Sequence, residues 1–456
     1  METNNHKLAA AEQITSGSIV RAVFRLATPV VLGMLMEVLL SITDFYWVGR
    51  LGSAAQDAIT SSMVLVWTVL SGATIISIGV TALVSRNIGA GKPERASYFT
   101  SQALWLAALI GTTVALAGAF LAPVLLELMK AGPDTTAHAL PYLRIFFTTC
   151  LLMFWSETIY AVFRAAGDTR TPTRVAITVV LINMVLDPVL IFGLGPFPAM
   201  GVPGAAVATA VAFAVGSSTI VRLLFKGKAG FPVRFPFRER PKPEALAKIA
   251  RIGLPIAGQQ LVFVLVYWFL IGFVHEFGEI AGAAMGVGNR MESLSYLTCY
   301  GFSLAASTLV GQNLGAGKPD RAARCAWSAT GLGMALTLVF GAAFIGVPGW
   351  IAGLFTDDPA TKAIAIDYLR ILGLSQSAMA VEIILEGAFS GSGDTLPPML
   401  VMIPASLARI PLAWLLAFEW GWGINGIWWT LTITTGFKAV VLGYWFYLGR
   451  WKRKKL

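Results

Sequence analysis

Two acidic residues interrupt the first long apolar stretch of the chain. Glu37 and Asp44 lie inside residues 24–48, a run otherwise long and apolar enough to span a bilayer. An ionised carboxylate in such surroundings is costly, and burial favours a form that has bound a proton or another cation. These residue types therefore predict reversible binding of H+, or of Na+, inside the membrane.

A second acid shares the depth of the first. Asp44 lies six residues before Arg50, and Asp187 lies six residues before Gly193, where the two helices are expected to end, so each acid is about 9 Å inside its helix. Asn183 is one helical turn from Asp187, and Thr209 comes at a matching depth on the next run. We expect these four side chains to form one cluster that binds the coupling ion and substrate. The alternatives are an interfacial Asp44, an Asp187 that pairs only locally, and a Thr209 bonded to its own backbone.

Two other residues of the first run have expected roles. Glu37 is seven residues from Asp44, on roughly the same helix face, and is expected to extend the polar path inward. Pro29 removes one helical hydrogen bond, so it is either a hinge that lets the helix change shape or a static bend.

The second half of the chain holds a weaker set of charges. Glu292, Glu386 and Arg290 are secondary candidates for an ion site. Glu382 shares a helix face with Glu386, and Arg290 is expected to neutralise one of the two. A structural salt bridge is therefore the favoured interpretation there.

Composition fixes the protein class. The chain has 456 residues, of which 56% are hydrophobic and 13% charged, and this is typical of an all-α, multi-pass membrane protein. The net charge of +10 follows the connectors between apolar runs, so it predicts no nucleic-acid partner. Cys150, Cys299 and Cys325 lack metal-ligand spacing. The N-terminus lacks a cleavable signal, so the first span is expected to direct insertion.

Twelve apolar runs indicate twelve transmembrane helices in two six-helix bundles. The expected domains are an N-lobe (1–228), a basic, proline-containing cytoplasmic linker (229–243) and a C-lobe (244–456). Lys and Arg gather at connectors on one side of the membrane, which predicts a plasma (inner) membrane protein with both termini in the cytoplasm. The predicted spans are 24–48, 54–84, 97–126, 140–163, 172–194, 203–225, 249–274, 280–311, 324–355, 364–390, 397–419 and 424–448.

An internal repeat relates the two halves. The segment that begins Asn87-Ile88-Gly89-Ala90-Gly91-Lys92-Pro93 recurs 226 residues later from Asn313, and Pro29, Tyr142 and Gly167-Asp168-Thr169 recur at the same spacing. Each half has an even number of spans, so the repeats run parallel and are expected to enclose a central cavity.

The acids are not repeated. At the 226-residue spacing Asp44 corresponds to Leu270 and Asp187 to Ala413, or to Arg409 if a shorter connector is counted at an offset of 222. Scaffolding alone does not explain acids that occur in one copy only. The glycine-rich segments match neither a phosphate loop nor a dinucleotide site in context, and no catalytic constellation is evident. We therefore expect a transporter that uses an ion gradient, no cofactor and no enzymatic chemistry.

The repeated Asn-x-Gly-Ala-Gly-Lys-Pro and Gly-Asp-Thr segments, with Thr43-Asp44 and the Asn183–Pro188 segment, resemble the multidrug and toxic compound extrusion (MATE) family, and its DinF branch in particular. The resemblance implies a V-shaped pair of bundles that exports organic cations or amphipathic compounds in exchange for H+ or Na+, with the lipid bilayer as surroundings and a monomer as the expected state. It also implies that Asp44, Asp187 and Asn183 form the cation site and that Pro29 permits bending. No residue of the seventh helix matches the acids that bind Na+ in the NorM branch.

Two other functions fit the same pattern less well. A flippase for lipid-linked saccharides or lipids would share the two lobes, but it favours a wide cationic cavity, and internal arginines are few here. A membrane-embedded enzyme or a passive channel is disfavoured by the missing catalytic groups and by the repeat around a closed cleft.

Overall fold

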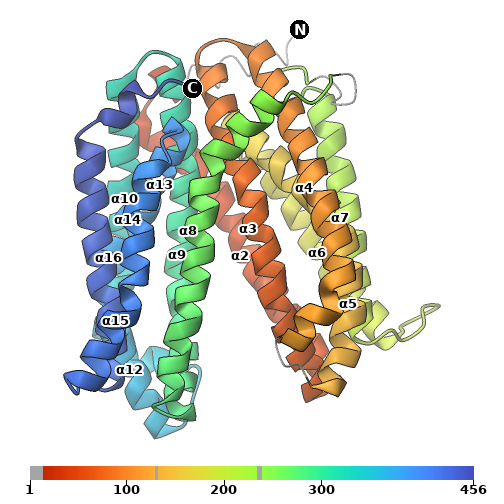
Figure 1. Ribbon diagram of the computed structural model, residues 1–456, viewed down its shortest axis with the longest axis vertical. Helices are drawn as coiled ribbons and strands as arrows, with labels where there is room; N and C mark the ends of the chain where they lie inside the picture. Colours follow the sequence, from red (N-terminus) through yellow and green to blue (C-terminus); the bar gives the residue numbers. More distant parts are fainter. Residues whose placement is uncertain (1–13, 129–131, 234–238) are drawn as a thin grey trace. The chain divides into compact units, whose positions relative to one another are not determined.

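The computed structural model describes residues 14–128, 132–233 and 239–456, and these residues form helices and loops with no strand among them (Figure 1). The helices of the first half are α2 (Ile19–Gly49), α3 (Ser53–Gly89), α4 (Pro93–Leu128), α5 (Pro133–Ala165), α6 (Arg170–Phe192) and α7 (Val202–Phe225). Those of the second half are α8 (Pro243–His275), α9 (Glu279–Gly315), α10 (Pro319–Gly346), α11 (Pro348–Gly353), α12 (Pro359–Gly373), α13 (Gln376–Ser392), α14 (Leu396–Leu407), α15 (Arg409–Trp414), the π-helix η2 (Leu415–Glu419), α16 (Ile424–Tyr447) and the 3-10 helix η3 (Arg450–Arg453).

Every predicted span coincides with a helix or a broken helix, which confirms the all-α membrane architecture. Among the described residues nine helices are long and apolar enough to cross a bilayer, and the pair α12 and α13 makes a tenth. The remaining two spans, α9 and α16, have comparable lengths but are richer in Gly, Ser, Thr, Trp and charged residues. A protein of this kind crosses the bilayer several times and is embedded in it.

Three spans of the second half are not single helices. The predicted span 364–390 is broken between α12 and α13, whose axes differ by 55°. Span 324–355 ends in the short α11, and span 397–419 consists of α14, α15 and η2. At the first of these breaks, Gly373 packs so closely that a Cβ on Gly341 would lie 2.6 Å from its carbonyl oxygen. Hydropathy reports apolar length and not helix continuity, so these breaks could not be predicted from it.

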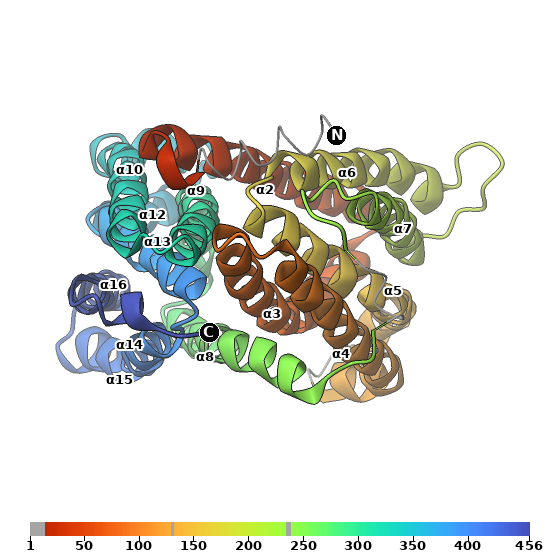
Figure 2. The ribbon, with the colours of Figure 1, turned by 90° about the horizontal axis from the view of Figure 1, so that it is seen from above.

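Packing divides the described residues into two units. Unit 1 comprises Leu32–Gly253, with α3 to α7 grouped together in Figure 2, and unit 2 comprises 14–31 together with Leu254–Leu456. This grouping differs from the expected N-lobe (1–228) and C-lobe (244–456) at two places: the start of α2 packs within unit 2, and the start of α8 packs within unit 1. Residues 1–13, at the start of the expected N-lobe, lie outside the described residues.

The two exchanged helix ends are held by matching close contacts. In unit 1, a Cβ at Gly253 of α8 would lie 1.8 Å from the carbonyl oxygen of Ile75 on α3. In unit 2, a Cβ at Gly301 of α9 would lie 2.4 Å from Val31 and 3.5 Å from the Ala27 carbonyl oxygen on α2. Ile75 and Gly301 are related by the 226-residue repeat, as are Ala27 and Gly253. The repeat therefore extends to packing, with a glycine on one of the two helices at each of these close contacts.

The most specific repeated motif is a helix C-cap. After α3, Lys92 N–H donates to Asn87 O (2.9 Å) and Gly91 N–H to Ile88 O (3.0 Å), with Gly91 at φ 67°. After α9 the same bonds recur: Lys318 N–H donates to Asn313 O (2.9 Å) and Gly317 N–H to Leu314 O (3.1 Å), with Gly317 at φ 71°. This is the Schellman arrangement, which requires a left-handed residue at that position. The motif turns the chain between helices and carries no chemistry of its own.

The end of the predicted linker lies against α4 in unit 1. Trp105 Nε1–H donates to Glu239 O (2.9 Å), and the Gln102 side chain bonds both Arg240 O (3.2 Å) and Lys242 N–H (2.8 Å). Residues 234–238, in the middle of the linker, lie outside the described residues. The part that leads into α8 is thus fixed to unit 1 by side-chain hydrogen bonds.

Candidate functional site

The four side chains expected to form one cluster do meet in unit 1. The orientation of the Asn183 amide that satisfies every neighbour directs its NH2 at both acids, donating to Asp187 Oδ2 (3.1 Å) and to Asp44 Oδ1 (3.2 Å). Its carbonyl oxygen then accepts from the hydroxyl and the N–H of Thr209, each at 3.0 Å. The cluster joins α2, α6 and α7.

The two carboxyl groups lie within hydrogen-bonding reach of each other. Asp187 is fully buried and Asp44 is half-buried. Asp187 Oδ1 is sealed from solvent and has no hydrogen-bond partner among the described residues. Two carboxylates in contact repel each other unless a proton or a cation lies between them. The arrangement can therefore bind H+ or, with the Asn183 oxygen turned inward, a small cation such as Na+.

Apolar packing at the helix ends holds the acids together. Trp47, one turn after Asp44, packs edge-on against Phe192 at the end of α6, with ring centroids 5.9 Å apart. Val48 and Ile191 are each 1% exposed in the same core. An aromatic pair of this kind contributes about 0.5–1.5 kcal/mol beyond its buried area. Tight packing one turn from each acid fixes the spacing between the carboxyl groups.

Pro188 follows Asp187 inside α6 and has no N–H to donate. The carbonyl of Met184, which would accept from that N–H in a regular helix, is left without its usual helical donor. A carbonyl that lacks this donor, one turn from an acid, is a further oxygen that a cation could use.

Tyr142 on α5 was not predicted as part of the site. It is buried, and Asp44 and Asp187 are the charged groups nearest to its hydroxyl. The signal available in the sequence was the repeated Tyr-Leu-Arg-Ile segment, which begins at Tyr142 and at Tyr368. Tyr368 is buried too, and its hydroxyl donates to Asn289 Oδ1 (2.9 Å) in unit 2.

Glu37 is placed in a different group. Its side chain is exposed on α2, and the charged groups near it are Glu157 and Arg164 of α5. Glu157 Oε1 accepts from Arg164 Nη2 (2.6 Å) and from the Ser77 hydroxyl (3.2 Å). Glu37 therefore borders a second polar group of unit 1, one neutralised largely by an arginine.

Pro29 lies inside α2, three residues before Leu32, where this helix passes from the packing of unit 2 to that of unit 1. Its repeat counterpart Pro255 lies inside α8, two residues after the corresponding boundary at Gly253. Both prolines thus lie where a helix changes the unit that it packs in.

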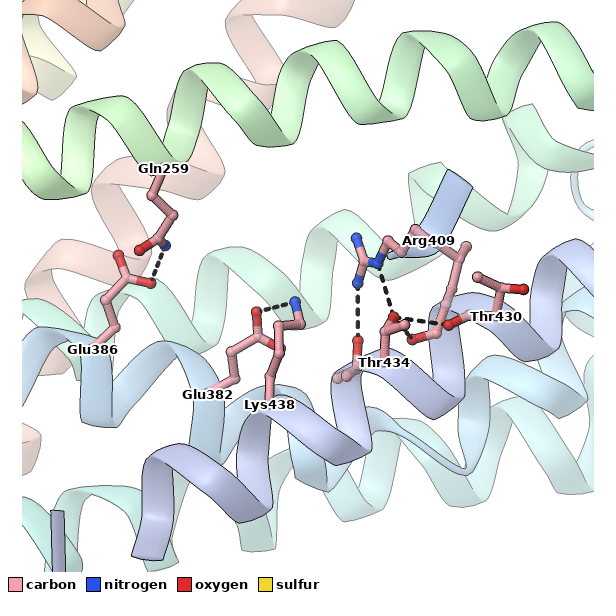
Figure 3. A network of polar contacts seen from close by, with 9 residues as sticks. Gln259, Glu382, Glu386, Arg409, Thr430, Thr434 and Lys438 are labelled. Atoms are coloured by element: carbon pink, nitrogen blue, oxygen red, sulfur yellow. Dashed lines mark hydrogen bonds and ion pairs between the residues drawn. The ribbon is translucent and has the colours of Figure 1, made fainter. Parts of the chain in front are cut away.

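The expected salt bridge of unit 2 has a different cation. Glu382 Oε1 pairs with Nζ of the buried Lys438 on α16 at 2.5 Å (Figure 3). Arg290 is exposed on α9 and forms no ion pair among the described residues, so the expectation that it neutralises Glu382 or Glu386 was wrong. Lys438 was missed because residues 424–448 were interpreted as a plain apolar span.

The other acids of unit 2 are partly satisfied. Gln259 Nε2 donates to Glu386 Oε2 (2.8 Å), as Figure 3 shows. Glu292 on α9 is half-buried, with Arg409 the charged group nearest to it. Among the described residues no group of three or more His, Cys, Asp and Glu side chains is placed to hold a metal ion.

These features define a helical membrane transporter built from a duplicated unit. The family model MatE matches residues 29–189 and 255–415, two segments related by the same 226-residue spacing as the repeat. The chain belongs to the MatE family, whose members are transporters and not enzymes.

Relatives and solved structures agree with this assignment. The chain is 27% identical over 439 residues to a probable multidrug resistance protein NorM of Thermotoga maritima, covering 95% of this chain and 93% of that protein. It is 27% identical over 444 residues to an FAD transporter of Shewanella oneidensis, covering 94% and 95%. A multidrug resistance MATE family transporter of the MOP superfamily, solved in an outward-facing conformation, shares the fold with a TM-score of 0.90 at 23% identity, covering 97% and 98%.

Proposed function

We propose that this protein is an H+- or Na+-coupled antiporter that exports amphipathic small molecules, organic cations among them, and that Asp44, Asn183, Asp187 and Thr209 bind the coupling ion. The observation that carries the proposal is the pair of carboxyl groups that share the Asn183 amide, one of them fully buried with an oxygen that has no partner among the described residues. Such a pair favours the binding of a proton or another cation because its empty, doubly ionised form is costly.

The residues divide the work. Asp44 and Asp187 take up the ion, Asn183 holds both carboxyl groups in place, and Thr209 orients the Asn183 amide. Neutralisation removes the repulsion between the acids and lets α2 approach α6. Pro29 allows the parts of α2 before and after it to move separately. It interrupts the helical hydrogen bonds near the point where α2 passes from unit 2 to unit 1. Substrate leaves as the ion enters, and each charge moved contributes about 2.3 kcal/mol per 100 mV.

The cell setting completes the proposal. We place the protein in the cytoplasmic membrane as a monomer with both termini inside, because Lys and Arg gather at the connectors on that side. Its relatives include a probable multidrug resistance protein and an FAD transporter, so substrates with flat aromatic rings are the first to test.

The test is efflux of a fluorescent dye from proteoliposomes under an imposed pH gradient, and separately under a sodium gradient at constant pH. Wild-type efflux should follow one of the two gradients. Asp44→Asn and Asp187→Asn should each lower gradient-driven efflux by about tenfold or more, since each removes one ionisable partner of the pair. Asp134→Asn, at an exposed acid of the same unit, is the matched control and should transport like wild type.

Two results would overturn the assignment. One is Asp44→Asn protein that transports at the wild-type rate under the same gradient, and the other is dye movement that needs no gradient at all. The hinge is tested by comparing Pro29→Ala with Pro123→Ala in α4. Pro29→Ala should slow efflux, and Pro123→Ala should not. Equal rates in the two proline variants would remove Pro29 from the mechanism.

A further inference from the structure

Arg409 in unit 2 is a buried cation whose hydrogen bonds go to hydroxyl groups only. The residue begins α15 and is 5% exposed. Its Nε–H donates to Thr434 Oγ1 (2.9 Å) and its Nη2 to Thr435 Oγ1 (3.2 Å), both on α16. Figure 3 shows the guanidinium beside α16 and turned toward α8. Hydroxyl partners accept hydrogen bonds but carry no charge of their own to offset that of the guanidinium.

No carboxylate forms an ion pair with Arg409 among the described residues. Glu382 is engaged by Lys438, and Glu292 lies near the guanidinium without a hydrogen bond to it. The remaining nitrogen, Nη1, has no partner in the described part of the chain and is not among the sealed polar atoms. A guanidinium offers five donors in a planar fork that suits a carboxylate or phosphate. One edge of that fork is open here.

An aromatic surface borders the open edge. The guanidinium carbon lies 5.9 Å from the ring centroid of Phe263 on α8. Phe263 is 45% exposed, and Tyr267 stacks on it with centroids 5.9 Å apart and an interplanar angle of 21°. Arginine and exposed flat rings together suit a flat aromatic compound that carries an oxyanion.

The repeat shows that this place in unit 2 corresponds to the ion site of unit 1. A Cβ on Gly204 of α7 would meet Leu190 and Ile191 of α6, and one on Gly426 of α16 would meet Leu416 and Ala417 of η2. The last turn of α6 therefore corresponds to η2 at a spacing of 226 residues. Of the two earlier alignments of Asp187, this packing selects Ala413.

At that spacing Arg409 takes the position of Asn183, while Leu270 and Ala413, both fully buried, take those of the two acids. Tyr368 lies near Arg409 as Tyr142 lies near the acids. Arg409 thus places a cation in the part of unit 2 that corresponds to the acidic cluster of unit 1, at the position of its neutral amide.

We propose that Arg409, with Thr434, Thr435 and the Phe263–Tyr267 stack, binds the carboxylate or phosphate of a flat aromatic substrate. This inference deepens the proposed function, on which it rests, by naming the substrate class as aromatic oxyanions or zwitterions. Thr434 and Thr435 orient the guanidinium, and the stacked rings hold the aromatic part. A lipid phosphate offers the same oxyanion chemistry, so the experiment must separate the two sources.

The experiment measures binding of acridine-9-carboxylate and its uncharged carboxamide to the purified full-length protein in phosphatidylcholine nanodiscs, by fluorescence anisotropy. Wild type should bind the carboxylate about tenfold or more tightly than the amide. Arg409→Gln should bind both alike, and Arg409→Lys should keep part of the preference because it keeps the charge. Arg370→Gln, at an exposed arginine of the same unit, should keep all of it.

Equal binding of the two probes by wild type, or an undiminished preference in Arg409→Gln, would overturn the proposal. So would a preference lost in Glu292→Gln, because Glu292 would then be part of the recognition and not a neighbour of it. The same measurement in anionic phosphatidylglycerol nanodiscs tests the lipid as the source of the oxyanion. If that lipid abolishes carboxylate binding to wild type, and Arg409→Gln restores the binding, the arginine binds a lipid headgroup instead.

Failure here is distinguishable from failure of the proposed function. If gradient-driven efflux depends on Asp44 while the carboxylate preference is absent, the antiporter stands and the oxyanion site falls. If the carboxylate preference depends on Arg409 while efflux is independent of every gradient, the oxyanion site stands and the antiporter falls.

Discussion

Gly253→Ala is expected to destabilise unit 1, although alanine is the better helix former. The added Cβ would lie 1.8 Å from the Ile75 carbonyl oxygen and 2.5 Å from its carbon, so α8 and α3 must separate by about 1.2 Å to reach even 3.0 Å. Both obstructing atoms are backbone, and no rotamer change relieves the contact. Overpacking of this kind costs about 1–3 kcal/mol.

Alanine recovers about 0.5–1 kcal/mol of helix propensity at any glycine inside a helix. Gly258→Ala, five residues further along α8, is therefore the matched control, because nothing lies within 4 Å of the Cβ it adds. The difference between the two variants isolates the clash of about 1–3 kcal/mol. For a unit of this size that corresponds to roughly 2–12 °C in the midpoint of thermal unfolding.

The assay is thermal unfolding of the purified protein in detergent, followed by the amount that still elutes as a single peak on size exclusion. Gly79→Ala, whose Cβ would lie 2.2 Å from the Ile249 carbonyl oxygen across the same contact, should behave like Gly253→Ala. Gly253→Ala protein that unfolds at or above the temperature of Gly258→Ala would refute the close approach of α8 and α3.

Three further changes probe the polar groups. Asn183→Leu should reduce gradient-driven efflux by about tenfold or more, because it removes the donor to both acids; unchanged coupling would exclude the amide from the site. Lys438→Met should lower stability by about 3–5 kcal/mol by leaving Glu382 unpaired, and the double change with Glu382→Gln should restore most of it in the same unfolding assay. Hydrogen bonds from Thr361 hold the pKa of Asp358 below its usual range. Asp358→Ala should therefore lower the unfolding midpoint at neutral pH, and the difference from wild type should vanish as pH falls through that lowered pKa.

The fold was predictable because lipid leaves few choices. Apolar length predicted all twelve spans, and the motif at Asn87 and Asn313 revealed the duplication. The exchange of helix ends was not predictable, since hydropathy says that a segment is buried in lipid or protein and not which helices it contacts. The glycines that permit the exchange, Gly253 and Gly301, are two among 46 and have no distinguishing local signal.

The site of unit 1 was predictable from depth alone. Asp44 and Asp187 lie at equal distances from their helix ends, and helical geometry then places Asn183 beside them. The expectation that Glu37 extends the polar path inward stays a prediction. The charged groups near it are Glu157 and Arg164 of α5, and a seven-residue spacing fixes the face of a helix but does not identify such neighbours.

The charges of unit 2 show why partner choice needs coordinates. Arg290 and Lys438 were both visible inside apolar runs, and Arg290 is the nearer in sequence to Glu292. The structure pairs Lys438 with Glu382 because α13 and α16 pack together, while Arg290 faces outward from α9. Sequence order carries no information on such cross-helix contacts.

The two copies of the scaffold share helix-packing contacts but differ in their buried polar side chains. The helix contacts at Ile75–Gly253 and Ala27–Gly301 occur at corresponding positions of the two copies, each with a glycine on one helix. The polar positions diverge completely: two acids and an amide in one copy, two apolar residues and Arg409 in the other. A charged group at membrane depth costs several kcal/mol, so a duplicated position that served packing alone would be apolar in both copies. Charges of opposite sign in the corresponding clusters, carried by different positions, instead favour a separate ligand for each copy, a cation in unit 1 and an oxyanion in unit 2.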